Sequence, residues 1–296
     1  MMRVTQGMIS RDLLRQLNNT NSRLYDLQQQ LVTGKKITKP SQDPVIASLG
    51  IAYRTEVAQI NQYSRNMDEV HNWTDNSESA LDQANSVLQR IRELTVEASN
   101  DTYTDDQRKD IQKEVSQLKE QLVNIVNTKV AGKYIFNGTN TSTPPVAIDA
   151  SGNVTTAYNA NAVQIEVNNG IKIPVNVNPN DAFPPSLFAD IQDLESALTT
   201  TPSDGKQIGS FLDKIDQHID EVVGARAELG ARMNRVDMID NRIGAQKQIA
   251  ETMMANNEDA QFEQVLVDYQ TQLSVQRAAL AVGSKIIQPT LVDFLS

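Results

Sequence analysis

Two regular patterns of apolar residues, one near each end of the chain, constrain the fold more than any other feature. Both alternate spacings of four and three residues, the repeat of a helix that packs along a partner helix. The N-terminal pattern consists of Leu13, Leu17, Thr20, Leu24, Leu27 and Leu31. The C-terminal pattern consists of Phe262, Leu266, Tyr269, Leu273, Gln276, Leu280, Gly283 and Ile287. A single amphipathic helix cannot bury its own stripe, so we predict that these helices pack against each other or against other molecules.

The N-terminal pattern stops in the stretch TGKKITKPSQDPVIA, residues 33–47. Gly34 suits the position after the last helical turn, and Lys35 and Lys36 are favourably placed near the carbonyl end of that helix. A phosphate-binding loop would need a glycine at position 29, which is Gln29, and a strand rather than a helix before it. We therefore interpret the lysines as part of a helix end.

A second helix is predicted to begin at the end of the same stretch. Pro40 allows the chain to change direction, Asp43 suits the N-cap position, and Pro44 suits the first helical position. Gly34, Pro40, Asp43 and Pro44 therefore form the predicted joint between a terminal helix and a long internal one.

Long helices are predicted inside the two terminal patterns. A helix beginning at Pro44 and ending near Asn100 carries an apolar stripe, and Thr104 with Gln107 forms a capping box for a helix over 105–129. A short helix is predicted at 186–199 and a long one at 206–256. The stripe of the first helix consists of Val70, Trp73, Ser77, Leu81, Ala84, Leu88, Ile91, Leu94 and Ala98.

Short alternating apolar runs and turn residues replace the helical pattern after residue 133. The Asn168-Asn169-Gly170 cluster between two such runs predicts a β-hairpin. The fold is therefore predicted to be mainly α: an elongated antiparallel helical rod with terminal coiled-coil helices and a small central β insertion. Its parts are a terminal coiled-coil assembly domain (1–44 and 257–296), a helical rod domain (45–133 and 186–256) and a small β-rich domain (134–185).

Composition excludes several classes of function. The formal net charge of -10 disfavours nucleic acid as a partner, and the absence of cysteine excludes disulfides and thiolate chemistry. No run approaches the roughly 18 apolar residues of a membrane span, so we expect no membrane insertion. No secretory signal is recognisable near the N-terminus, so export would use a route without a cleaved signal peptide.

No catalytic, cofactor-binding or metal site is predicted. The histidines His71 and His218 stand alone, apart from Asp68 one turn before His71, and two ligands do not make a metal site. Ser116 and Lys119 match a Ser-x-x-Lys pattern, but they lie within a predicted helix without a further catalytic group. Three Asn-x-Ser/Thr sequons, at Asn137, Asn140 and Asn153, are interpreted as turn residues.

Several blocks resemble the bacterial flagellin superfamily. LQQQLVTGKKITKPSQDPVIA, residues 27–47, is similar to the family's link between terminal coiled coil and rod, and LDQANSVLQRIRELTVEASN, residues 81–100, is similar to its long helix. GARAELGARMNRVDMID, residues 224–240, resembles the returning helix, and residues 275–296 resemble the C-terminal helix. The PSQDPV variant and GKYIFNGTNTSTPPV, residues 132–146, resemble the branch that joins hook and filament more than the filament subunits.

The resemblance implies a structural protein rather than an enzyme. Its expected role is a subunit of the hook-filament junction, outside the cell, that polymerises through its terminal helices after type III export. The implied partners are further copies of the same chain, the first hook-filament junction protein, flagellin, and an export chaperone at the C-terminal arm. Two alternatives remain open, a filament flagellin and another coiled-coil adaptor exported by a type III system.

Overall fold

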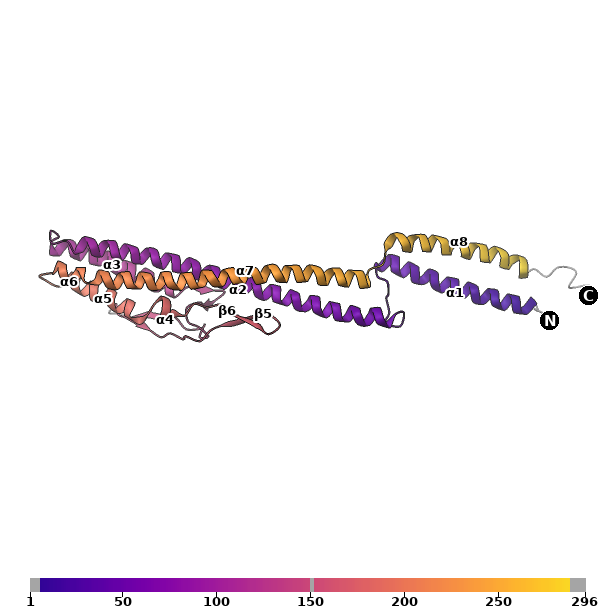
Figure 1. Ribbon diagram of the computed structural model, residues 1–296, viewed down its shortest axis with the longest axis horizontal. Helices are drawn as coiled ribbons and strands as arrows, with labels where there is room; N and C mark the ends of the chain where they lie inside the picture. The colour runs from indigo at the N-terminus through magenta and orange to yellow at the C-terminus, as the bar shows by residue number, and fades with distance from the viewer. Residues whose placement is uncertain (1–5, 150–151, 288–296) are drawn as a thin grey trace, which may run out of the picture. The chain divides into compact units, whose positions relative to one another are not determined.

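Long helices and small antiparallel strand pairs make up the chain, as a computed structural model describing residues 6–149 and 152–287 shows (Figure 1). The predicted mainly α fold is confirmed. The chain divides into two compact units: a terminal unit, Met1–Gln59 with Gln246–Ser296, and a central unit, Ile60–Ala245. Within the described ranges, no helix has the length and hydrophobicity needed to cross a membrane.

The terminal unit pairs the two outer helices of the chain. Helix α1 (Gln6–Thr33) lies beside α8 (Phe262–Ile287), and the two run antiparallel (Figure 1). The direction follows from contacts along their length, because Lys35 pairs with Asp259 while Asn21 accepts a hydrogen bond from Gln276. The sequence left open whether the terminal helices pack against each other or against other molecules. In this structure they pack against each other.

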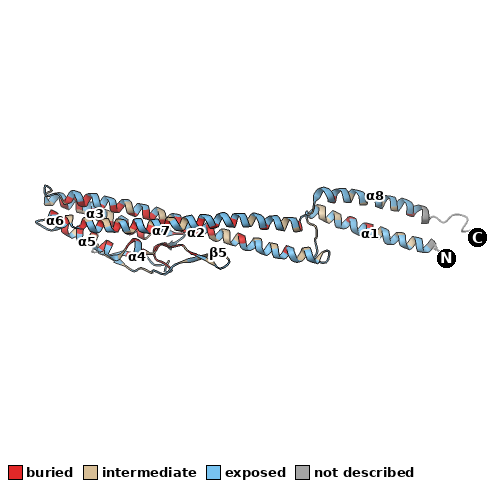
Figure 2. Ribbon diagram, viewed as in Figure 1, coloured by how far each residue is buried: buried red, intermediate tan, exposed pale blue. Residues whose placement is uncertain are grey.

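The central unit is built around the part of the long helix α2 (Pro44–Ala98) that follows Gln59. All nine residues of its predicted stripe are buried, and Figure 2 shows buried residues along the helices of this unit. Helix α7 (Phe211–Glu258) runs antiparallel to α2, since Arg92 pairs with Asp216 while Glu78 pairs with Arg226. Helices α3 (Asp105–Val126) and α5 (Pro185–Thr199) pack together in the same unit.

Two predicted helix starts have different outcomes. The capping box of α3 is confirmed, with Thr104 accepting from the backbone of Gln107 and the Gln107 side chain accepting from Thr104. The predicted start of a long helix at Lys206 is wrong, because residues Gly205–Gly209 form a separate short helix, α6, and α7 begins at Phe211. Glycine at position 209 weakens the helix there, and the chain turns at Ser210 before it restarts.

Three antiparallel strand pairs lie between α3 and α5. They are β1 (Lys129–Val130) with β2 (Lys133–Tyr134), β3 (Val146–Ile148) with β4 (Val154–Thr156), and β5 (Gln164–Asn168) with β6 (Ile171–Pro174). The predicted hairpin is confirmed, with a left-handed glycine at its turn, Gly170, whose φ is 72°. A short helix that the sequence did not predict, α4 (Pro179–Ala182), follows β6.

The strand region contributes large side chains to the core of the central unit. Phe136 and Phe183 are both completely buried, and their rings meet edge to face with centroids 5.2 Å apart. Such pairs add stability beyond the area that they bury. The β insertion is therefore part of the core of this unit and not a peripheral decoration.

Candidate assembly surface and helix joint

Gly34 ends α1 as the sequence predicts. Its φ is 67°, a left-handed conformation that glycine adopts without steric cost, and its N–H donates to the carbonyl of Gln30 at 2.8 Å. The chain then runs beside the segment between α7 and α8. Lys36 N–H donates to the Glu258 carbonyl at 2.7 Å, and Ala260 N–H donates to the Gly34 carbonyl at 2.8 Å. Two loops more than two hundred residues apart in the sequence are thus joined through their backbones.

The predicted restart of the helix is also confirmed. The Asp43 carboxylate accepts from the backbone N–H groups of Val45 and Ile46 at 2.9 and 3.0 Å, and Pro44 occupies the first helical position. Pro40 lies in an exposed turn closed by a hydrogen bond from Gln42 N–H to the Lys39 carbonyl. All four predicted joint residues therefore lie in the connection between α1 and α2.

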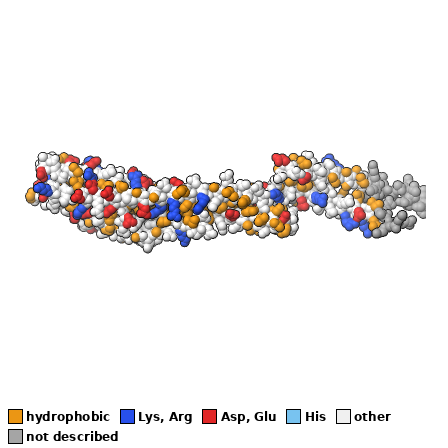
Figure 3. All heavy atoms as spheres, in the orientation of Figure 1, with side chains coloured by type: hydrophobic (Ala, Val, Ile, Leu, Met, Phe, Trp, Pro, Cys, Tyr) orange, Lys and Arg blue, Asp and Glu red, His pale blue; other side chains and the backbone are white. Residues whose placement is uncertain are grey.

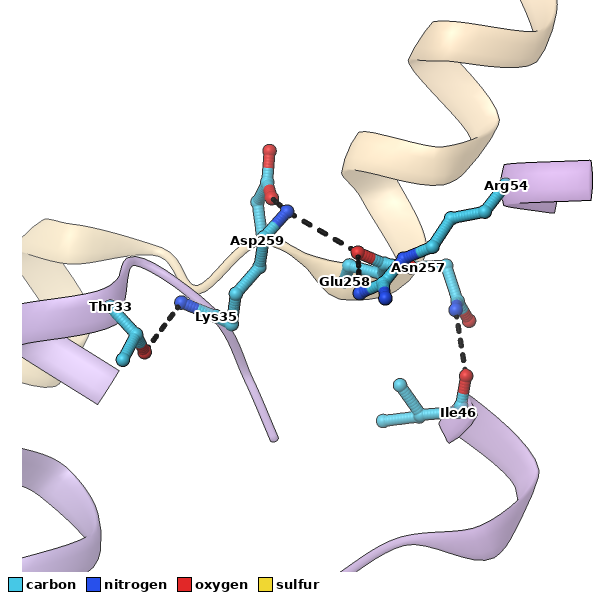
Figure 4. Close-up of polar contacts among 7 residues, drawn as sticks. All are labelled: Thr33, Lys35, Ile46, Arg54, Asn257, Glu258 and Asp259. Atoms are coloured by element: carbon cyan, nitrogen blue, oxygen red, sulfur yellow. Dashed lines mark hydrogen bonds and ion pairs between the residues drawn. The ribbon is translucent and has the colours of Figure 1, made fainter. Parts of the chain in front are cut away.

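The two lysines after Gly34 contact the end of a different helix from the one predicted. Lys35 Nζ lies 2.7 Å from an Asp259 oxygen and 3.3 Å from a Glu258 oxygen (Figure 4). Lys36 Nζ donates to the Asn256 carbonyl. Lys36 therefore caps the carbonyl end of α7, where the helix dipole favours positive charge, and Lys35 neutralises carboxylates at the same end.

Glu258 is the centre of the joint. The residue is only 5% exposed, and its carboxylate receives two hydrogen bonds from Arg54, each 2.7 Å long, as Figure 4 shows. This parallel pairing is the strong geometry for an arginine and a carboxylate. Close approach requires a glycine on α2, because a Cβ at Gly50 would lie 2.7 Å from a Glu258 oxygen. Nearby, the Asn257 side chain donates to the Ile46 carbonyl at 3.0 Å.

Sequence reasoning missed this cluster. A glycine such as Gly50 by itself only weakens a helix, and nothing in the local pattern marks Arg54 or Glu258. The two charged partners are separated by 204 residues, so no helical spacing connects them. Their pairing becomes visible only when the ends of α2 and α7 are placed together.

Acid should loosen the joint through Glu258. The hydrogen bonds from Arg54 hold the pKa of this carboxyl below its ordinary 4.5 despite its burial, and Lys35 adds to the effect. A carboxylate with a lowered folded-state pKa stabilises the fold above its unfolded pKa, and that contribution is lost as the pH falls through the folded value. We therefore expect the amide protection of Lys36 and Ala260 against hydrogen exchange to fall below about pH 4.5.

The Glu258→Gln variant is the control for that experiment. It removes the titrating group, so protection at these two amides should already be low at neutral pH and should change less in acid. Exchange rates corrected for the intrinsic pH dependence of each amide provide the measurement. An equal loss of protection in both proteins would assign the acid effect to other carboxylates.

The predicted N-terminal seam faces α8. Leu24 and Thr20 are buried at 8% exposure each, and the remaining members are half-buried. Those half-buried residues are Leu13, Leu17, Leu27 and Leu31. Near the other end of the helix pair, the Leu13 side chain lies against Gly283. A Cβ added at Gly283 would lie only 2.8 Å from the Leu13 side chain.

The members of the predicted C-terminal seam on α8 differ in how far they are buried. Tyr269 and Leu273 are half-buried, whereas Phe262, Leu266 and Leu280 are 59%, 38% and 52% exposed. Val265, which the prediction did not include, is buried. Ile287 ends α8, and its side chain lies outside the described residues.

Both terminal helices therefore keep an outer apolar face, and Figure 3 shows hydrophobic side chains among the charged ones on the visible surface of the pair. Large apolar side chains that stay exposed can form interaction sites on soluble proteins when they gather in a patch. The exposed large residues on α1 are Met8, Ile9, Leu14, Tyr25 and Val32. Those on α8 are Phe262, Leu266, Val267, Val275, Leu280 and Val282.

The lysine of the Ser-x-x-Lys pattern and the two histidines contact carboxylates of the protein. Lys119 is buried, and its ammonium lies 2.6 Å from the Glu195 carboxylate, so it is engaged in an ion pair rather than with Ser116. His218 lies between Asp190 and Glu221, while His71 is 3.9 Å from Asp240. Among the described residues, no group of three or more His, Cys, Asp or Glu side chains is arranged so that it could hold a metal ion.

The sequon asparagines serve local structure. Asn137 is buried, donates to the Thr143 carbonyl and accepts from the Asn159 N–H. The Asn153 side chain donates to Asp149 within the turn between β3 and β4. Both contacts agree with the interpretation of these asparagines as turn residues.

Comparison with known proteins identifies relatives of this chain. Residues 4–141 match the family model of the bacterial flagellin N-terminal helical region. The chain is 26% identical to flagellar hook-associated protein 3 of Escherichia coli strain K12 over 301 residues, covering 94% of this chain and 95% of that protein. It is also 26% identical to the protein of the same name from Salmonella typhimurium strain LT2, covering 96% of this chain and 95% of that protein.

A solved structure shares the fold. The crystal structure of flagellar hook associated protein-3 from Legionella pneumophila has a TM-score of 0.63 at 15% identity, covering 69% of this chain and 98% of that chain. The fold and the relatives are those of structural flagellar proteins. With a family match over its N-terminal helices and relatives matched over nearly their whole length, this chain is similar to the proteins of the bacterial flagellin superfamily.

Proposed function

We propose that the chain is a structural subunit of the bacterial flagellum that forms the junction between hook and filament by polymerising through its terminal helices. The observation that carries the proposal is the outer apolar face that α1 and α8 retain after they have paired with each other. Relatives named hook-associated protein 3 match almost the whole chain, which favours the junction over the filament.

The inner and the outer apolar residues of each terminal helix have different roles in this proposal. The inner faces, with Leu24 and Val265, hold the helices of one chain together. The outer faces, with Leu14 on α1 and Phe262, Leu266 and Leu280 on α8, are available to neighbouring subunits. Burial of these residues between subunits supplies the hydrophobic free energy of polymerisation, at about 1.5–3 kcal/mol for each large side chain.

The same proposal includes the partners of the subunit. Copies of this chain would contact one another, the first hook-filament junction protein below them and flagellin above them. An export chaperone would cover the C-terminal arm until the chain has passed through the type III apparatus. Exposed apolar residues on α8 support this part, because such a surface needs a cover before assembly.

Deletion of the gene tests the function. We expect cells with hooks but without filaments, with flagellin released into the medium, and electron microscopy of the cells with analysis of the medium measures both. Unchanged filaments and motility would contradict a flagellar role and favour another coiled-coil adaptor. Quantification of the chain in isolated flagella separates the remaining alternative, because a filament flagellin would be present in thousands of copies rather than in a single layer.

A further inference from the structure

The joint in the terminal unit contains a pocket that α1 and α8 do not fill. Its volume is about 150 Å³, and it lies between the loop after α1 and the first turns of α2. Its apolar wall consists of Ile37, Pro40, Ile46, Ala47 and Ile51. A cavity of about 150 Å³ with apolar walls is large enough to hold a benzene ring in another protein. The size and lining of the pocket therefore suit one aromatic side chain.

The rim of this pocket is basic. Lys35, Lys39 and Arg54 all contribute to it, and Glu258 forms its acidic wall. Lys35 and Arg54 are already paired with Glu258. Lys39 has no ion-pair partner within the described part of the chain. The pocket therefore offers an apolar floor with one available positive charge at its edge.

The chain carries a matching pair of side chains at the start of α8. Phe262 is 59% exposed although it is aromatic, and Val265 rather than Phe262 is buried on this turn of the helix. Glu263 follows it, is also exposed, and has no ion-pair partner among the residues that the structure describes. An aromatic side chain next to an unpaired carboxylate complements an apolar pocket next to an unpaired ammonium.

We propose that Phe262 of one copy inserts into the joint pocket of a neighbouring copy, with Glu263 beside Lys39 of that neighbour. The two surfaces are different parts of the chain, so the contact is head-to-tail, and repetition of such a contact produces a ring or a helical assembly. The proposal rests on the proposed function, because it names the contact by which the subunits of the junction would hold one another at the level of the joint.

Cysteine cross-linking tests the contact directly, because the natural chain contains no cysteine. Cells that lack the gene would express two variants together, Lys39→Cys and Glu263→Cys, and flagella would be isolated under oxidising conditions. Each chain carries one cysteine, so a disulfide between positions 39 and 263 can form only between copies. We expect a species of twice the 32.8 kDa chain mass that disappears on reduction.

A matched pair controls for chance encounters. Lys113 lies in the central unit with a side chain that is 74% exposed, so Lys113→Cys with Glu263→Cys should form little of the doubled species. If the Lys39 and Glu263 variants enter flagella and filaments form, but their cross-linking does not exceed this control, the proposed contact is wrong while the proposed function stands. Intact filaments in cells that lack the gene would instead overturn the proposed function.

Truncation of the aromatic ring gives a second measurement. Phe262→Ala should lower the amount of the chain in isolated flagella by about tenfold or more, since each subunit contact loses a buried ring. Gln270→Ala, at an exposed polar position of the same helix, should leave that amount nearly unchanged. Equal amounts of both variants in flagella would contradict the insertion of Phe262.

Discussion

Replacement of Leu24 by Asp should abolish incorporation of the chain into flagella and lower motility to the level of a strain without the gene. Leu24 is 8% exposed at the contact between α1 and α8. Loss of its packing together with burial of a charge should cost about 3 kcal/mol or more, which a pair of isolated helices cannot absorb. Swimming assays and the amount of the chain in isolated flagella measure the effect.

Two controls separate this effect from a general loss of folding. Gln28→Asp introduces the same charge at an exposed position of α1 one turn later and should retain motility. Trp73, the only tryptophan, is buried in the central unit, so its fluorescence reports whether that unit still folds in the Leu24→Asp protein. Normal incorporation of the variant would show that pairing of α1 with α8 is not required for assembly.

Replacement of Phe136 by Ala should lower the free energy of unfolding of the central unit by about 3–5 kcal/mol. The side chain is completely buried and meets Phe183 edge to face, so truncation leaves a cavity and removes an aromatic contact. Denaturation by guanidinium chloride, followed by the fluorescence of Trp73, measures the change within the same unit.

The comparison variant for Phe136→Ala is Val223→Ala. Val223 belongs to the central unit but is 46% exposed, so its truncation should change stability by less than about 0.5 kcal/mol. A small effect of both substitutions would mean that the strand region is not part of the cooperative core. The β insertion would then be a dispensable attachment to the helices.

Periodic patterns predicted the central helices well. Every residue of the α2 stripe is buried, because a helix of 3.6 residues per turn presents such a stripe to one side whatever packs against it. The signals at Gly34, Asp43 and Thr104 were equally reliable, since a helix end is satisfied by residues within one turn. The break at Ser210 was missed, since a single glycine inside a helical pattern is usually tolerated.

The candidate assembly surface was predictable only in part. The leucine seam of α1 is buried or half-buried throughout, whereas the seam of α8 is half-buried only in part and otherwise exposed. Spacing alone selected Phe262, Leu266 and Leu280, whereas the buried large residue near the start of the helix is Val265. The role of the exposed residues in assembly stays a prediction, and the variants proposed above test it.

The stretch TGKKITKPSQDPVIA shows both what the sequence determines and what the tertiary structure determines. The sequence by itself determined where α1 ends and α2 begins, because Gly34, Asp43 and Pro44 act on their own backbone and its immediate neighbours. Only the tertiary structure decided what Lys35 and Lys36 neutralise, because their partners lie more than 200 residues further along the chain. Local conformation follows from neighbours in sequence, whereas ion pairs and exposed faces depend on which distant helices meet.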